Sequence, residues 1–346
     1  MEKRYISYLF EQLRNLSEIP SPTGYYTEMQ EYLIREVEAM GYAAQKFNRG
    51  GFRVDLGGQG DTLVITSHMD DIGLSVRYID GQGRLHLNNI GGLYAPYTLF
   101  SNVTVITRSG KKYTGTVQKI RPSVHQKLSA EEIFERMEYD TNIVVYLDKF
   151  VSCRQDVEDL GIHCGDFIAL QTNYTVTEDG FIKSRFLDDK SCTAVLLTYM
   201  KYLKEEKVEL SRHIVAHFSA FEETGNGGCT GLPDDICEMI ALDIGVVGGE
   251  SDAREDKVSI CVRDARGHYS RDVVNLLIEL AEKNTIPHSV DVNMPSYGSD
   301  TNAAIEAGYD IRHSCFGPGV FATHGYERAH KEGIVATLQL LTLYAK

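Results

Sequence analysis

Apolar positions in the chain follow two different periods, and the change between them marks its parts. Between residues 29 and 40 apolar side chains recur at steps of three and four, and Gly41 follows, which predicts an amphipathic helix with a glycine stop. Residues 63–66 form an unbroken apolar, largely β-branched run, typical of a strand that is buried on both faces. The opening of the chain therefore predicts helix, loop, helix and strand.

From about residue 73 to about residue 172 the pattern consists of short alternating runs separated by glycine-containing turns, with a polar stretch at residues 121–140. This texture predicts a small β-barrel or sandwich. Helical periodicity returns at residues 189–204, and strands then alternate with helices, as in an α/β sheet protein. We expect one discontinuous α/β domain, residues 1–72 and 173–346, with a β domain, residues 73–172, inserted into it.

Composition and charge narrow the function classes. Of 346 residues 42% are apolar and 24% are charged, an ordinary globular mix, and no apolar run is long enough to span a membrane. The 49 acidic against 35 basic residues give a net charge of −14, which repels nucleic acid and anionic membranes, so neither is expected as a partner. Charges interrupt the first twenty residues, unlike a secretory signal, and seven cysteines without a C-x-x-C pair indicate reduced thiols in the cytoplasm.

The first candidate for chemistry is His68-Met69-Asp70, which directly follows the predicted strand at residues 63–66. In open α/β sheets, function gathers at the carboxyl ends of strands. His68 could bind a metal while Asp70 fixes the other ring nitrogen, an arrangement that metal sites favour. The alternative is a surface turn with no chemistry.

Two acidic pairs are further candidates. Asp188-Asp189 stands where the predicted inserted domain returns to the α/β domain, and a plain helix N-cap is the alternative there. Glu222-Glu223 leaves an apolar strand and precedes a glycine-rich loop. Burying two like charges is costly unless a cation is shared, so one glutamate could bind a metal while its neighbour acts as general base. A solvated loop is the alternative.

Two single residues complete the candidate set. Asp243 ends an apolar run, and His324 lies within residues 321–327, between a Gly/Pro-containing loop and the last predicted helix. The set as a whole has two histidines, two aspartates and two glutamates, which suits Zn, Co or Mn rather than Cu or an Fe–S cluster. Five ligands with a shared water would make a two-metal hydrolase site. The whole candidate set comprises His68, Asp188, Glu222, Glu223, Asp243 and His324.

A series of motifs runs along almost the whole chain in a specific order. It comprises Ile19-Pro20-Ser21-Pro22-Thr23-Gly24, His68-Met69-Asp70-Asp71-Ile72-Gly73, Leu160-Gly161-Ile162-His163-Cys164-Gly165-Asp166, Leu187-Asp188-Asp189, Glu222-Glu223-Thr224-Gly225, Ser299-Asp300-Thr301 and His324-x-x-Glu327. In these motifs the chain resembles the dinuclear metallo-aminopeptidases of the glutamyl aminopeptidase and tetrahedral (TET) type, some of which were once labelled endoglucanases.

The resemblance implies a mixed-sheet zinc-peptidase domain with a small inserted β-barrel, PDZ-like, that serves in dimerisation. It also implies two divalent ions per subunit, Zn or Co, and homo-oligomers that reach a tetrahedral dodecamer. Asp188 would bridge the ions, and Asp243 would share one ion with it. Glu222 would be the general base and Asp70 would orient His68. The implied metal ligands are His68, Asp188, Glu223, Asp243 and His324.

The chain departs from the family pattern at three places. The family usually has Asp-Glu where this chain has Asp70-Asp71, and Arg where it has Lys190. It usually has an Arg-Tyr pair in the stretch that here spans residues 317–323. These departures spare every implied ligand and leave the substrate pocket and specificity open.

The leading functional hypothesis is an aminopeptidase that removes N-terminal residues from peptides. A second hypothesis keeps the scaffold but assigns an N-acyl amino acid deacylase or a carboxypeptidase. A non-catalytic assembly protein would lack a ligand, and no implied ligand is missing. A glycosidase that uses Glu222 and Glu223 is disfavoured, because acids adjacent in sequence rarely face each other across a sugar.

Overall fold

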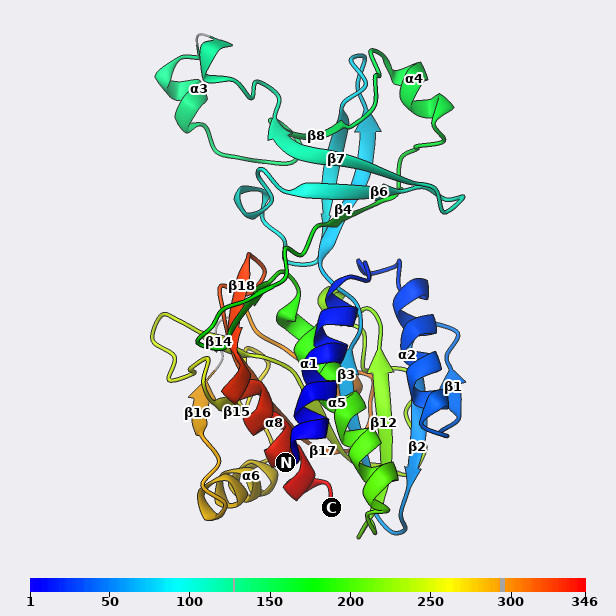
Figure 1. The fold of residues 1–346 in the computed structure, drawn as a ribbon, viewed down its shortest axis with the longest axis vertical. Helices are drawn as coiled ribbons and strands as arrows, with labels where there is room; N and C mark the ends of the chain where they lie inside the picture. The colour runs from blue at the N-terminus through cyan, green and yellow to red at the C-terminus, as the bar shows by residue number, and fades with distance from the viewer. Residues whose placement is uncertain (127, 293–295) are drawn as a thin grey trace. The chain divides into compact units, whose positions relative to one another are not determined.

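The structure, a computed structural model, describes residues 1–126, 128–292 and 296–346. It divides into two compact units: Met1–Asp71 with Thr172–Lys346, and Ile72–Gln171. The larger unit contains a mixed sheet with helices, and the smaller unit contains a closed antiparallel barrel (Figure 1). The predicted fold class is confirmed.

The larger unit holds most of the helices and the longer sheet. Its helices are α1 (Lys3–Ser17), α2 (Thr27–Ala39), α5 (Leu187–Glu206), α6 (Arg271–Lys283), α7 (Asp300–Glu306) and α8 (Lys331–Tyr344), with the short turn η3 (Glu222–Thr224). Its strands are β1 (Ala44–Lys46), β2 (Phe52–Gly57), β3 (Thr62–His68), β10 (Thr175–Val176), β11 (Phe181–Ser184), β12 (His213–Ser219), β13 (Ile236–Leu242), β14 (Gly245–Val247), β15 (Val258–Arg263), β16 (His288–Val292), β17 (Arg312–Phe321) and β18 (Glu327–His330).

The centre of the sheet is parallel. The main path runs β1-β2-β12-β3-β13-β17-β18-β11-β10, and β3 pairs in parallel with both β12 and β13. In this register His68 is the partner of Ser219. The carboxyl ends of three neighbouring strands therefore meet at one edge of the sheet, which is where α/β proteins place their chemistry.

Both faces of β3 are buried, as its apolar run predicts. Leu63 and Ile65 belong to the main apolar core, which also contains the buried faces of α1, α2, α5, α6 and α8. Val64, between them, packs in a second cluster with Met239 of β13 and Ala304 of α7. Successive side chains of a strand point to opposite faces, so these two clusters fix the strand between two helical layers.

The smaller unit is a six-stranded closed barrel in the order β4-β5-β8-β7-β6-β9. Its elements are β4 (Gly73–Ile79), β5 (Leu85–Ile90), η1 (Ala95–Tyr97), β6 (Asn102–Ile106), β7 (Lys112–Lys119), η2 (Val124–Gln126), α3 (Ala130–Phe134), β8 (Ile143–Leu147), α4 (Arg154–Asp159) and β9 (Phe167–Leu170). Buried valine, leucine and isoleucine alternate with more exposed residues, for example Val103 and Val105 on β6. Closure pairs the strand edges that an open sheet would expose.

One sequence expectation is wrong. The Gly/Pro-containing segment before residue 321 was expected to be a loop, yet Gly317, Pro318 and Gly319 belong to β17. A Cβ on Gly317 would lie 2.1 Å from the backbone oxygen of Asp243, and one on Gly319 would lie 2.2 Å from that of Arg254. These glycines are therefore needed because neighbouring backbones pass close to the strand, and they do not mark a turn.

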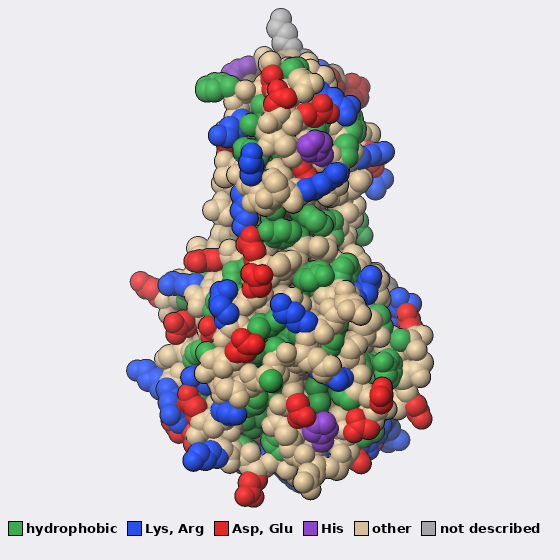
Figure 2. Space-filling model, turned by 90° about the vertical axis from the view of Figure 1, so that its right-hand side faces the viewer, with side chains coloured by type: hydrophobic (Ala, Val, Ile, Leu, Met, Phe, Trp, Pro, Cys, Tyr) green, Lys and Arg blue, Asp and Glu red, His purple; other side chains and the backbone are tan. Residues whose placement is uncertain are grey.

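One face of the larger unit carries charged side chains of both signs. On the face of the larger unit drawn in Figure 2, acidic and basic side chains are interspersed and do not gather into one patch of a single sign. In the part of the chain that the structure describes, none of the helices combines the length and apolar character needed to cross a membrane.

Candidate metal centre

The edge formed by the central strands brings the predicted residues together. His68 is the last residue of β3, Asp243 follows β13, and Glu222 and Glu223 form the turn after β12. Asp188 comes from the first turn of α5. His324 follows β17 and completes the group. Segments far apart in the sequence thus supply the side chains of one cluster.

Asp188 lies at the middle of this cluster. Its Oδ1 is 3.2 Å from Nε2 of His68, and its Oδ2 is 3.6 Å from Nε2 of His324. That histidine nitrogen is also 3.6 Å from Oε2 of Glu223. The two oxygens of one carboxylate therefore face two different imidazoles.

Two groups of potential metal ligands share Asp188. His68, Asp188 and Glu223 form one group, and Asp188, Asp189 and Asp243 form the other; within each group one ligand atom per residue lies within 4.8 Å of the others. The carboxylates of the second group are all buried. Like charges held this close in a dry site require protons or cations to balance them.

The pKa values of the acids show this imbalance. Burial, together with the charge of Asp188, raises the pKa of Asp243 to about 8. Burial also raises the pKa values of Glu222 and Glu223 well above their usual range, and the neighbouring acids add to this effect. The pKa of Asp188 is lowered: burial acts to raise it, but hydrogen bonds from His324 and His68 outweigh burial.

The two histidines respond in the opposite way. Burial acts to lower the pKa of His68, but the hydrogen bond to Asp188 and nearby acids raise it well above its usual value. Burial also acts to lower the pKa of His324, but the charge of Glu223 and the hydrogen bond to Asp188 raise it to about 10. Protons thus compensate the excess of acids here, in positions where a divalent cation would do so.

Asp70 connects His68 to the glutamate pair. His68 Nδ1 lies 2.9 Å from the backbone carbonyl of Asp70 and 3.7 Å from its carboxylate. The carboxylate accepts hydrogen bonds from Thr23 Oγ1 at 2.7 Å and from the backbone N–H groups of Glu222 at 3.1 Å and Glu223 at 3.4 Å. The backbone of Asp70 therefore orients His68, while its side chain holds the turn that carries the two glutamates.

Most of the chain matches one known protein family. The M42 glutamyl aminopeptidase family matches residues 50–340, most of the chain. The chain belongs to the M42 family. The resemblance stated from the motifs is thereby confirmed, and with it the activity class, an aminopeptidase that hydrolyses peptide bonds.

Two relatives align with most of this M42 chain. YhfE of Bacillus subtilis, which carries a provisional aminopeptidase name, is 37% identical over 340 residues, 97% of this chain and 96% of YhfE. The lysyl aminopeptidase of Pyrococcus furiosus is 23% identical over 299 residues, 85% of this chain and 84% of the relative. The solved TET1 peptidase of Pyrococcus horikoshii, described as assembling into a tetrahedron or a large octahedral shell, shares the fold with a TM-score of 0.86 at 21% identity, over 97% and 99% of the two chains.

Two acids of the M42 chain have positions that the sequence did not predict. The Asp189 carboxylate accepts hydrogen bonds from Ser67 Oγ at 2.7 Å and from the backbone N–H of His68 at 3.2 Å. The N-cap residue of α5 is Phe186, whose side chain makes no cap hydrogen bond, and both acids lie inside the helix, so the N-cap alternative for the pair fails. The adjacency of the two acids was the available signal for Asp189.

Glu327 is the second such acid. Its carboxylate accepts hydrogen bonds from the backbone N–H groups of Asp188 and His324, both at 3.1 Å. Burial and the charge of Asp188 raise the pKa of Glu327 to about 8. The motif His324-x-x-Glu327 was visible in the sequence, but only the fold shows that the acid holds two segments of the cluster.

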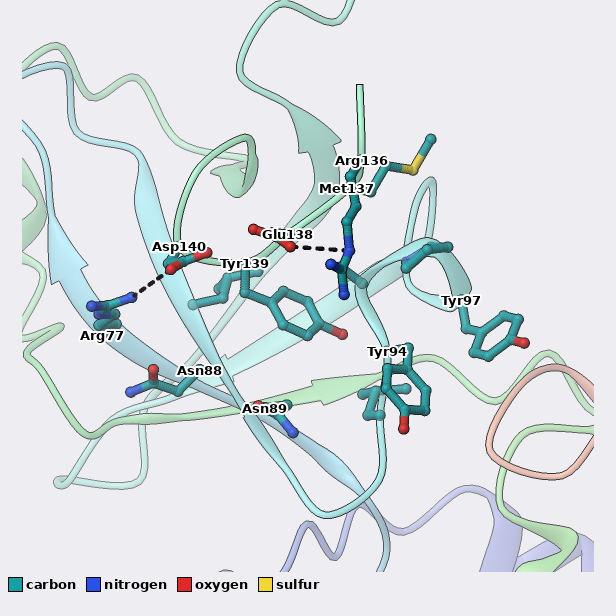
Figure 3. A pocket seen from close by; sticks show the side chains of 14 residues that line it. Arg77, Asn88, Asn89, Tyr94, Tyr97, Arg136, Met137, Glu138, Tyr139 and Asp140 are labelled. Atoms are coloured by element: carbon teal, nitrogen blue, oxygen red, sulfur yellow. Dashed lines mark ion pairs between the residues drawn. The ribbon is translucent and has the colours of Figure 1, made fainter. Parts of the chain in front are cut away.

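The barrel unit of the M42 chain has a cavity of another kind. A pocket of about 690 Å³ lies between β5, the loop around Tyr94 and residues 136–140 (Figure 3). Its lining holds no histidine or cysteine, and its two acids pair with arginines, Asp140 with Arg77 and Glu138 with Arg136. Across the described residues, the groups able to hold a metal occur only in the larger unit.

Proposed function

We propose that this M42 aminopeptidase is metal-dependent and holds two divalent ions, with Asp188 between them and Glu222 as general base. The observation that carries the proposal is the Asp188 carboxylate, whose two oxygens face His68 and His324 and which belongs to both ligand groups. A bridging carboxylate needs both oxygens directed to separate sites. With both ions bound, the enzyme would remove N-terminal residues from peptides.

The donor set fits such ions. Carboxylates with two imidazoles suit Zn or Co, and the buried acids, whose pKa values are raised, supply the negative charge that divalent ions require. We assign His68 and Asp243 to one ion, and Glu223 and His324, whose Oε2 and Nε2 lie 3.6 Å apart, to the other. This assignment separates His68 from Glu223, although the two lie in one ligand group. Asp189 already accepts two hydrogen bonds through Oδ2, so we assign it to support.

Glu222 differs from its neighbour Glu223 in its access to solvent. Its side chain is 17% exposed, against 6% for Glu223, and its Oε2 is 4.0 Å from Nε2 of His68. Bound ions supply Lewis acidity to the attacking water and the scissile carbonyl. Glu222 takes a proton from that water and passes it to the leaving amine, which is the work of a general base and then a general acid.

We further propose that residues 73–172 form a dimerisation domain and that the chain assembles into homo-oligomers, with a tetrahedral dodecamer as the form to test. The likeness to the TET1 peptidase supports this, and so do large apolar side chains exposed on the barrel unit, including Phe134 at 85% and Phe100 at 71%.

All seven cysteines are free, which supports the cytoplasm as the compartment.

A substrate panel tests the activity. The purified chain is assayed with aminoacyl chromogenic substrates, their N-acylated counterparts and peptides blocked at the C-terminus, before and after chelation. We expect cleavage only where the N-terminus is free, and loss of turnover on chelation. Preferential hydrolysis of N-acyl amino acids, or release of C-terminal residues, would replace the aminopeptidase by the deacylase or carboxypeptidase alternative.

A further inference from the structure

A buried ion pair lies close in sequence to the proposed metal ligands and has no role in the proposed reaction. Nζ of Lys190 is 2.9 Å from Oδ2 of Asp71, and each residue is only 1% exposed. Lys190 is two residues after Asp188, and Asp71 is three residues after His68. These are also two of the positions at which the sequence departs from the family pattern, and the fold places them against each other.

The pair closes a ring between two segments that carry ligands. His68 and Asp188 approach to 3.2 Å at one end of the ring, and Asp71 and Lys190 approach to 2.9 Å at the other. A shift of α5 relative to the end of β3 would have to break both contacts. The spacing of the His68 and Asp188 side chains therefore depends on an ion pair that touches neither of them.

The pair also fixes a third segment, the turn at residues 19–23. Lys190 Nζ donates a hydrogen bond to the Ile19 carbonyl at 2.9 Å, and the Asp71 carboxylate accepts one from Ser21 Oγ at 2.8 Å. In the same turn Thr23 Oγ1 donates to Asp70, the acid that holds the backbone of Glu222. A continuous set of bonds thus runs from Lys190 to the turn that carries the general base.

A buried ion pair is weak evidence for stability alone, because desolvation offsets most of its attraction. We propose that Asp71 and Lys190 are a positioning pair that sets the geometry of the metal ligands, a role that rests on the proposed function. Groups that orient metal ligands without touching the metal are worth about 10- to 100-fold in metal affinity.

The test uses the full-length chain and Co²⁺, whose visible absorption reports ligand geometry. Lys190→Met removes the cation, and Lys190→Arg retains it. The control is Arg212→Met, which removes one cationic partner of another buried acid: Glu238 lies 2.8 Å from Arg212 and keeps Arg312 at 3.0 Å. Glu238 is the register partner of Leu63, five residues before His68, so this pair lies toward the opposite edge of the sheet.

We expect Lys190→Met to bind Co²⁺ about 10- to 100-fold more weakly with a changed spectrum, and Lys190→Arg to recover most of the affinity. Arg212→Met should lower the denaturation midpoint while affinity and spectrum stay those of the parent. If Lys190→Met does not fold, Asp71→Asn with Lys190→Met removes both charges and should fold yet still bind weakly. The inference would be overturned if Lys190→Met or the double variant bound Co²⁺ as tightly as the parent. It would also be overturned if Arg212→Met weakened Co²⁺ binding equally. A parent chain that binds no Co²⁺ would instead overturn the proposed function.

Discussion

The metal-centre edge of the larger unit and the interior of the barrel unit are buried by opposite means. The barrel interior consists mainly of alternating apolar residues such as Leu85, Leu87, Val103 and Val105. The metal-centre edge instead buries carboxylates and a histidine against one another. Apolar burial stabilises a fold by itself, whereas buried charges are costly without partners. The contrast indicates that the edge is built for chemistry and the barrel interior for stability.

The largest effect should follow from removing the side chain shared by both ligand groups. Asp188→Ala takes away the carboxylate between the two proposed ions, and their mutual repulsion is then less compensated. We expect loss of both metals and of turnover, measured by elemental analysis and an aminoacyl substrate. A variant that still holds two ions per chain tightly would show that Asp188 does not bridge.

The next effect separates the two neighbouring glutamates. Glu222→Gln cannot accept the proton of water, so we expect turnover to fall about 10²- to 10⁴-fold while the metal content stays near that of the parent. Glu223→Gln is the matched control and should weaken metal binding. If the first variant loses metal and the second does not, the two roles must be exchanged.

Glu327 tests whether the edge depends on residues that are not ligands. Glu327→Gln replaces one of two acceptor oxygens by a donor that opposes the N–H groups of Asp188 and His324. We expect about 10- to 100-fold weaker metal binding in a chelator competition. Unchanged affinity would mean that the backbone positions of the two ligands do not need this acid.

The comparison also predicts a pH dependence confined to the edge. The pKa values of Asp243, at about 8, and His324, at about 10, lie above their ordinary values, so the folded, metal-free chain binds these protons more tightly than the unfolded chain. Their stabilisation is complete below the ordinary pKa values and is lost as the pH rises through 8 and 10. The melting temperature of the metal-free protein should therefore fall between pH 6.5 and 9. Asp243→Asn should flatten this slope, and a melting temperature that rises over the range would contradict the assignment.

The smallest effect on the edge should come from the barrel. Phe134→Ser removes an exposed aromatic side chain from α3 and should reduce the size of the assembly in light scattering. Metal content and kcat/KM per chain should stay within about twofold of the parent, because the proposed metal ligands belong to the larger unit. Loss of metal with an intact assembly would break the division of roles.

Sequence patterns predicted the features that depend on hydrophobic periodicity and on the position of residues at the ends of strands. The barrel follows from alternation, and five of the six candidate residues were proposed because they adjoin a predicted strand or helix, whereas His324 was proposed from a loop segment. The partnership of Asp71 with Lys190 was not predictable, because 119 positions separate the two residues. The role of Glu327 was also hidden, since its partners are backbone N–H groups that leave no trace in residue type. Strand β17 was missed because Gly317 signals a turn in sequence but a close backbone approach in the fold.

The central claim is that the acid cluster around Asp188 holds two divalent ions needed for aminopeptidase activity. The most direct measurement titrates the chelated, metal-free chain with Zn²⁺ or Co²⁺ and follows bound metal and turnover of an aminoacyl substrate together. The account predicts no turnover without metal and full recovery as two ions bind per chain. Saturation at one ion with full turnover, or undiminished activity in chain shown to be free of metal, would contradict it.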